Sequence, residues 1–272
     1  MSDYNGIIPD LAFAQYTAAP GVNNSMLKIL CDKTPAHLRA YLDGPPQEPT
    51  AAQRFGQLLH SFLLQPETMD GAYHVKPDGM KFNTKEGKAW QDEHAGKPIL
   101  SSEEHAQIEA MVAAVHSHPS AKRLMANAAF EQSIFVTDSH GTKLKLRPDI
   151  LPHAGDYLPD VKTCDSAKAN DFTKAIAQYG YYRQAAFYLD GCALAGREFK
   201  AFVFIAVEKT PPYAVACHVL DPLAVDLGRL HYKRALSVYR ECLETGKWPA
   251  YSDGVNFIGL PPWMQKELEM AA

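Results

Sequence analysis

The sequence predicts one α/β domain in which a helical N-terminal layer precedes a sheet flanked by helices. Apolar residues recur at helical spacing through the first third, alternate in short runs from about residue 126, and then form one almost continuous apolar run. No linker, repeat or change in composition divides the chain. We therefore expect residues 1–272 to form a single domain, with 1–125 mainly helical plus a polar loop and 126–272 forming the sheet and its helices.

The N-terminal helices are predicted from caps and apolar stripes. Asn24 or Ser25 can cap a first helix, and a second stripe covers residues 55–63. A capping box at 101–104 opens a helix that should end before the proline at position 119. Residues 76–97 carry several lysines and four acidic residues, so their composition favours a solvated loop or short helix.

The C-terminal part changes to strand spacing. Strands are expected over 130–136, 142–151 and 157–163, joined by short turns into a three-stranded meander. A long helix should follow over about 170–189. The run 199–207 is typical of a strand covered on both faces, with 213–220 as its partner. Asp221-Pro222 then opens a last helix that runs to about Thr245, with Gly246 past its end.

Composition excludes several classes of protein. Lys plus Arg number 27 against 31 Asp plus Glu, a formal net charge of -4, so the chain does not bind nucleic acid through bulk charge. The five cysteines show no C-x-x-C spacing, and the common nucleotide-binding, serine-hydrolase and zinc-protease motifs are missing. No apolar run approaches the roughly 20 residues of a membrane span, and the acidic start lacks a signal peptide's basic region. We expect a cytoplasmic protein.

Three charged residues on two predicted strands carry the chemical signal. Strand side chains alternate, so Asp160 and Lys162 project to one face while Val161 enters the other. A neighbouring strand can bring Asp149 beside Asp160. Paired carboxylates repel unless a cation neutralises them, and their hard oxygens favour Mg²⁺ or Mn²⁺. Lys162 beside them could polarise water or stabilise charge on a phosphate, as metal-assisted phosphodiester hydrolysis requires.

Each candidate residue also has an interpretation in which it has no catalytic role. An Asp-x-Lys strand is common by chance and can be a surface ion pair, although Asp149 upstream raises the chance of a site. Glu131 could add a carboxylate or simply be a solvated strand end. His60 could be a buried structural histidine. Gln184 and Tyr188, spaced i, i+4 on a helix, could serve only in packing.

In the order of its motifs, the chain resembles the RecE-type exodeoxyribonuclease VIII family, within the PD-(D/E)xK nuclease superfamily. The matching motifs span nearly the whole chain and comprise Phe55-Gly56-x-x-x-His60, Thr84-Lys85-x-Gly87-Lys88, Glu131, Arg147-Pro148-Asp149, Asp160-Val161-Lys162-Thr163, Tyr179-Gly180-Tyr181-x-x-Gln184-x-x-x-Tyr188, Val207-Glu208-Lys209-x-Pro211-Pro212 and Gly246-Lys247-Trp248-Pro249-x-Tyr251. The resemblance implies a PD-(D/E)xK core, with a mixed central sheet flanked by helices.

The resemblance also implies an activity and a set of partners. It implies a double-strand DNA exonuclease of phage style, related to lambda exonuclease, that uses Mg²⁺, with Mn²⁺ as a substitute. Such an enzyme digests the 5′ strand from DNA ends and leaves 3′ single-stranded tails for recombination. Family members pair with a single-strand annealing protein and assemble as ring-shaped homo-oligomers around DNA.

Roles follow residue by residue from the resemblance. Asp149 and Asp160 would bind the metal together with the Val161 carbonyl and His60. Lys162 would position or activate water. The remaining implied catalytic residues are Gln184, which would orient Lys162 or the phosphate, together with Tyr188 and Glu131. Asp160 stands where the superfamily commonly has Glu, which shortens its reach without changing its role.

A ring makes the negative net charge compatible with DNA, because basic residues can face a central channel. Arg54, Lys81, Lys85 and Lys88 are candidates for lining it, although any exposed lysine can serve solubility alone. Two other functions stay open: a nicking or repair endonuclease on the same core, and a non-enzymatic DNA-binding module.

Overall fold

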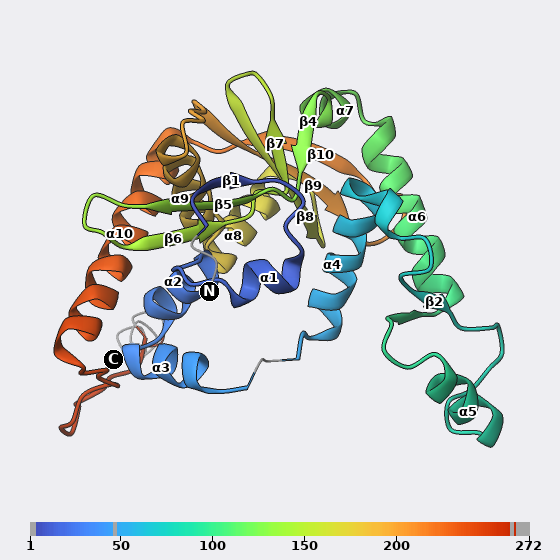
Figure 1. The fold of residues 1–272 in the computed structure, drawn as a ribbon, viewed down its shortest axis with the longest axis horizontal. Coiled ribbons are helices and arrows are strands. Elements are labelled where there is room, and N and C mark those ends of the chain that lie inside the picture. The colour runs from blue at the N-terminus through green and yellow to red at the C-terminus, as the bar shows by residue number, and fades with distance from the viewer. Residues whose placement is uncertain (1–3, 46–47, 262–263, 265–272) are drawn as a thin grey trace, which may run out of the picture.

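The computed structural model describes residues 4–45, 48–261 and 264. Its centre is a three-stranded mixed sheet in which β8 (Tyr157–Cys164) pairs in parallel with β9 (Ala201–Glu208), and β10 (Val215–Val219) pairs with β9 in antiparallel fashion (Figure 1). The register sets Asp160 opposite Phe204 and Lys162 opposite Ala206. β9 is apolar and buried along most of its length, as predicted, because helices cover both faces of this sheet.

Two cores lie on the two faces of the central sheet. On one face, Leu158, Phe202 and Phe204 belong to a large cluster with side chains of the C-terminal helices. On the other face, Val161 and Ile205 belong to a second cluster with the N-terminal helices. Since β8 runs between the two cores, any polar side chain at its middle is removed from solvent.

The strands before β8 differ from the predicted meander. The expected strand over 130–136 is interrupted, giving β4 (Ala128–Phe130) and β5 (Ser133–Thr137), and the one over 142–151 gives β6 (Lys143–Leu146) and β7 (Ile150–Pro152). Pro148 has no N–H for a ladder, which explains the second break.

These shorter strands pair among themselves rather than with β8. β5 and β6 form the predicted hairpin, β1 (Gly6–Ile8) joins β5, and β4 pairs with β7. The prediction of a three-stranded meander was therefore wrong, because the third strand, β8, takes β9 as its ladder partner.

The N-terminal helices match the predicted stripes and box. The first predicted helix exists, but Asn23, not Asn24 or Ser25, caps it by accepting a hydrogen bond from the Met26 N–H at 3.0 Å. The capping box at Ser101 is confirmed. In order, the elements are α1 (Phe13–Ala18), α2 (Asn24–Asp32), α3 (Pro35–Asp43), α4 (Ala51–Leu64), η1 (Pro66–Thr68), β2 (His74–Val75), α5 (Lys85–Glu93), β3 (Ile99–Leu100), α6 (Ser102–Ser117) and α7 (Pro119–Met125).

The long helix expected over 170–189 is two helices. Gly180 takes the left-handed conformation with φ +71°, so α8 (Ala169–Tyr179) ends there and α9 (Tyr181–Leu194) starts in a new direction. The last helix, α10 (Pro222–Thr245), was predicted correctly, with the Asp221 side chain capping its start and Gly246 at its end.

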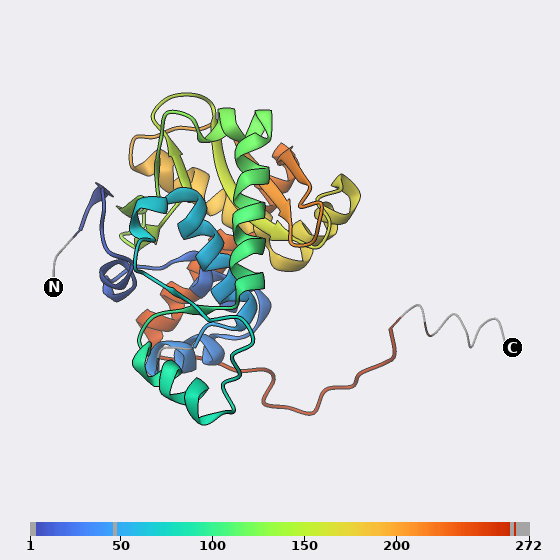
Figure 2. The same ribbon diagram turned by 90° about the vertical axis from the view of Figure 1, so that its right-hand side faces the viewer.

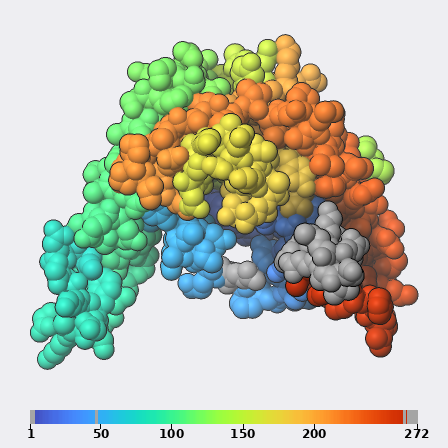
Figure 3. Space-filling model, turned by 180° about the vertical axis from the view of Figure 1, so that it is seen from behind, coloured from blue at the N-terminus to red at the C-terminus, as the bar shows by residue number. Residues whose placement is uncertain are grey.

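The molecule is hollowed on one side. β2, α5 and β3 belong to a lobe that hangs from α6, and α3 with the end of α10 lies on the other side of the hollow (Figures 1 and 3). The view along the other axis shows α6 standing upright, with the α5 lobe at its foot (Figure 2). Among the described residues, no helix is long and apolar enough to cross a bilayer.

Candidate active site

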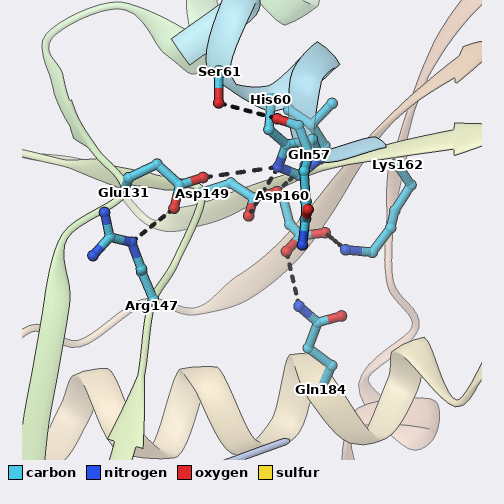
Figure 4. A network of polar contacts seen from close by, with 10 residues as sticks. Gln57, His60, Ser61, Glu131, Arg147, Asp149, Asp160, Lys162 and Gln184 are labelled. Atoms are coloured by element: carbon cyan, nitrogen blue, oxygen red, sulfur yellow. Dashed lines mark hydrogen bonds and ion pairs between the residues drawn. The ribbon is translucent and has the colours of Figure 1, made fainter. Parts of the chain in front are cut away.

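Two charged side chains of β8 lie side by side in the middle of the fold. Asp160 is only 1% exposed, and its Oδ2 lies 2.5 Å from the Lys162 Nζ (Figure 4). Its Oδ1 accepts a hydrogen bond of 3.1 Å from the Gln184 amide on α9. The predicted common face of Asp160 and Lys162 is therefore present, and it points toward the helix that carries Gln184.

Asp149 reaches the same place from the segment between β6 and β7. Its Oδ2 accepts a hydrogen bond of 2.8 Å from the buried Val161 N–H. The side chain therefore replaces a ladder contact between the two chain segments and is fixed beside Asp160. The predicted approach of the two aspartates is confirmed in geometry, although it is made by a loop residue rather than by a continuous strand.

Glu131 stands in the break between β4 and β5 and has an unusual backbone. Its φ is +52°, a left-handed conformation that costs a non-glycine residue about 1 to 2 kcal/mol. The Glu131 N–H donates to the Asp149 carbonyl at 3.0 Å, and its Oε2 accepts from the Arg147 Nε at 2.9 Å. The strained backbone therefore holds the carboxylate next to Asp149.

His60 completes the cluster from α4. Its Nδ1 lies 3.6 Å from the Asp149 Oδ1 and 3.8 Å from the Glu131 Oε1. One ligand atom from each of these three residues fits within 4.8 Å of the others. Gly56, one turn earlier, would meet no atom within 4 Å if it carried a Cβ, so open space adjoins His60 on the helix.

The charges of the cluster shift the protonation of its members. Burial lowers the pKa of His60, but the carboxylates of Asp149 and Glu131 outweigh it and raise the pKa to about 9. Burial and the nearby Asp149 raise the pKa of Asp160 to about 6, against the opposing effect of Lys162. Burial also disfavours the ammonium of Lys162, yet Asp160 and Asp149 raise its pKa above the usual value.

The donor set fits a divalent cation. Asp160 Oδ2 is buried and is paired with the Lys162 ammonium. Asp149, Asp160 and Glu131 nevertheless bring three carboxylates together, and carboxylates this close repel one another unless a cation neutralises them. The carboxylates of Asp149 and Glu131 and the imidazole of His60 offer donors that suit Mg²⁺ and Mn²⁺. Asp160, predicted as a ligand, is not in this group of three and pairs with Lys162 instead, so its ligand role stays a prediction. Val161 binds Asp149 through its N–H, and a ligand role for its carbonyl stays a prediction.

Gln184 and Tyr188 lie on the site side of α9, as their spacing suggested. Gln184 bonds Asp160 and not Lys162, so the structure gives it the carboxylate rather than the ammonium to orient. Burial raises the pKa of the Tyr188 hydroxyl well above its usual value, and Asp160 and Asp149 add to this effect. Tyr188 therefore stays a neutral phenol beside the carboxylates.

The four predicted DNA-binding residues are not part of this cluster. Arg54 is exposed near the start of α4, while Lys81, Lys85 and Lys88 are exposed on the α5 lobe (Figure 1). Thr84 and Gly87, which belong to the same motif as Lys85 and Lys88, have structural roles. The Thr84 hydroxyl accepts from the Gly87 N–H at 3.1 Å, and a Cβ on Gly87 would collide with the Lys81 carbonyl. Thr84 and Gly87 thus build the start of α5.

Sequence reasoning missed the part played by Arg147. Its guanidinium binds Glu131 and also donates to the Leu11 carbonyl and the Ser133 hydroxyl, each at 2.8 Å. It lies over the rings of Phe13 and Tyr16. The motif around Asp149 contained Arg147, but no local signal shows a contact with residues more than a hundred positions earlier.

A family model describes most of the chain. Residues 24–261 match the PDDEXK-like domain of unknown function, DUF3799. The chain belongs to this PDDEXK-like family. The superfamily suggested by Asp149, Asp160 and Lys162 is thereby confirmed, whereas the narrower RecE-type resemblance stays a prediction. No match to the chain was found among curated proteins.

Solved structures support the same fold. The PDDEXK-like chain matches the crystal structure of a protein from Eubacterium rectale, described as a candidate exonuclease, with a TM-score of 0.63 and 14% identity over 94% of this chain and 98% of that one. At this identity the likeness establishes the fold. SSO0001 matches at a TM-score of 0.30 and 14% identity over 72% of this chain and 97% of that one, which is too weak to support an argument.

Proposed function

We propose that this PDDEXK-like chain is a metal-dependent DNA exonuclease that hydrolyses phosphodiester bonds. One observation carries the proposal: Asp149, Asp160 and Lys162 meet at the middle of the fold with Glu131 and His60, a cluster of carboxylates that a divalent cation would neutralise. A binding module would gain nothing from clustered carboxylates at its centre, since they repel one another and repel DNA.

Each residue of the site has a separate role in the proposed hydrolysis. A divalent ion at the carboxylates would neutralise them and polarise the scissile phosphate. Lys162, held by Asp160, places a positive charge where negative charge develops on the phosphate and can donate a hydrogen bond to the attacking water. Gln184 fixes the orientation of Asp160, and Arg147 fixes Glu131. Tyr188 and the surrounding core limit access of bulk water.

The finer assignment follows the RecE-type resemblance. We propose digestion of the 5′ strand from double-stranded DNA ends, with Mg²⁺ as the ion and Mn²⁺ as a substitute, to leave 3′ tails for strand annealing. The proposal includes a single-strand annealing protein as partner, a ring-shaped homo-oligomer, and a bacterial or phage-encoded protein acting in the cytoplasm. The hollow beside the α5 lobe offers a surface on which the DNA end can lie (Figure 3).

The test compares linear duplex, labelled at the 5′ or 3′ end, with covalently closed circular duplex in Mg²⁺. We expect mononucleotides from the 5′ strand of linear DNA, intact circles, and no products without divalent ions. Asp149→Ala, Asp160→Asn and Lys162→Ala, verified as folded, should each lose at least 100-fold in rate. Rapid cutting of circles would establish the endonuclease instead, and binding without hydrolysis would leave the DNA-binding module.

A further inference from the structure

A pair of tyrosines connects the site with the protein surface at the junction of α8 and α9. The ring of Tyr181 lies with its centroid 5.1 Å from the Lys162 Nζ. The ring of Tyr179 lies 5.5 Å from that of Tyr181, with the two planes 31° apart, and Tyr179 is 48% exposed. The chemistry proposed above uses neither ring.

The pair is held in place from beneath and from the side. Tyr181 packs on Phe172 and Phe204, with centroid separations of 6.4 and 6.0 Å. The carbonyl of Tyr179 accepts a hydrogen bond of 2.9 Å from the Lys28 Nζ on α2. The exposed ring of Tyr179 therefore stands on a fixed backbone, so a ligand that stacks on it has little backbone entropy to overcome.

We propose that Tyr179, backed by Tyr181, is a stacking platform for a nucleobase of the strand whose phosphate lies at Lys162. An aromatic face stacks on every base, so such a contact tolerates any sequence, as a nuclease needs. Within a duplex, neighbouring bases cover both faces of each base. The platform therefore takes an unpaired nucleotide, so the end of a duplex must fray before its terminal base can stack on Tyr179. This inference rests on the proposed function and names a substrate class within it.

The test measures binding with cleavage disabled by Asp160→Asn. Single-stranded oligonucleotides carrying one 2-aminopurine at successive positions from the 5′ end serve as probes. We expect strong fluorescence quenching at one position, and Tyr179→Ala should abolish it and weaken binding about 5- to 100-fold. Tyr179→Phe should keep both, because stacking needs the ring and not the hydroxyl.

A matched control and the salt dependence separate stacking from general damage. Tyr157 is 49% exposed at the far end of β8 from Lys162, so Tyr157→Ala removes an equally exposed ring and should change neither quenching nor affinity. Tyr179→Ala should leave the slope of log K against log salt unchanged, because a neutral ring releases no counterions. In the otherwise unaltered enzyme, Tyr179→Ala should raise KM for single strands more than it lowers kcat.

Two results would overturn the platform: wild-type affinity and quenching in Tyr179→Ala, or equal losses in the Tyr157→Ala control. Failure of the proposed nuclease function gives a different result. The wild-type chain would then release no nucleotides in Mg²⁺, while the binding and quenching measurements would still report on the platform.

Discussion

Each acidic side chain of the site is held by a group from another part of the chain. The Val161 N–H holds Asp149, the Gln184 amide holds Asp160, and the guanidinium of Arg147 holds Glu131. These contacts fix carboxylates that would otherwise repel one another, so the site is arranged before any cation binds. Repulsion between these carboxylates lowers the stability of the folded chain, and this is the cost of a preorganised site.

The stability given up can be measured at Asp160. Its pKa of about 6 in the folded chain exceeds the roughly 4 of an exposed carboxyl, so the folded state binds this proton more tightly than the unfolded state. Its contribution to stability is full below about pH 4 and is lost as the pH rises to about 6. Asp160→Asn should therefore raise the free energy of unfolding of the metal-free protein at pH 7.5 by on the order of 1 to 3 kcal/mol. Chemical denaturation at pH 7.5 and pH 4 measures this.

The effect of Mg²⁺ on Tm is a control for the Asp160→Asn variant. Mg²⁺ should raise the Tm of the wild-type chain, because a ligand that binds only the folded state stabilises it. It should do so much less in Asp160→Asn. An Asp160→Asn chain that is less stable than wild type at pH 7.5 would contradict the repulsion argument.

His60 leads to a prediction about protons. With a pKa of about 9, its imidazole is protonated at pH 7.5 in the metal-free chain, and a metal ligand must be deprotonated. Binding of Mn²⁺ should therefore release about one proton per ion. Calorimetry in two buffers of different ionisation enthalpy measures this release. The His60→Gln variant should release none, and equal heats in both buffers for the wild type would remove His60 from the ligands.

Arg147 connects the cluster with the N-terminal segment. A lysine cannot bind Glu131, the Leu11 carbonyl and the Ser133 hydroxyl together, because it lacks the fork of the guanidinium. We expect Arg147→Lys to raise the Mn²⁺ concentration for half-maximal thermal stabilisation by roughly 10-fold. Arg240→Lys is the control, since Arg240 pairs with Asp138 outside the cluster. Equal effects of the two substitutions would show that Arg147 has no special link to the metal.

At the scale of elements, the sequence predicted what local pattern determines. The strand with Asp160 and Lys162, the capping box at Ser101 and the last helix from Asp221 all have signals within a few residues. The pairing of β8 with β9 is set by burial of both its faces, which depends on distant helices. The left-handed backbone of Glu131 is likewise fixed by its contacts with Asp149 and Arg147, so no local pattern predicts it.

Two glycines, one between two helices and one inside a helix, should respond oppositely to the same substitution. Gly180 has φ +71°, so Gly180→Ala should lower the free energy of unfolding by about 1 to 2 kcal/mol. Gly56 lies inside α4 with open space around its Cβ position, so Gly56→Ala should raise it by about 0.5 to 1 kcal/mol. Denaturant titration of both variants checks the signs. Destabilisation by Gly56→Ala would mean that the space beside His60 is not open.

On the scale of the whole molecule, a net charge of -4 has to be reconciled with a polyanionic substrate. The acidic cluster is buried and paired in part with Lys162, Arg147 and His60, so little of its charge faces DNA. Lys81, Lys85 and Lys88 are exposed on the α5 lobe, which borders the hollow (Figure 1). The lobe also carries the exposed Asp78, Glu86, Asp92 and Glu93, so DNA binding there depends on contacts of single lysines with phosphates and not on a positive field.

This arrangement predicts how salt affects binding. Replacing Lys85 and Lys88 with alanine should weaken duplex binding and reduce the slope of log K against log salt by up to about 2, because each phosphate contact releases roughly one counterion. Metal binding at Asp149 and Asp160 should not change. Anisotropy titrations at several salt concentrations, in Ca²⁺ to block cleavage, measure the DNA affinity and the salt slope.

The control removes equal charge from another part of the surface. Lys233 and Arg234 are exposed on α10, on the opposite side of the molecule from the α5 lobe (Figure 1). The Lys233→Ala/Arg234→Ala variant should therefore keep the wild-type salt slope and affinity. If both double variants lower the slope equally, the α5 lobe makes no specific phosphate contact and attracts DNA only through net charge. If neither does, DNA enters the hollow by contacts with other residues, and the lobe is a connection between α4 and α6.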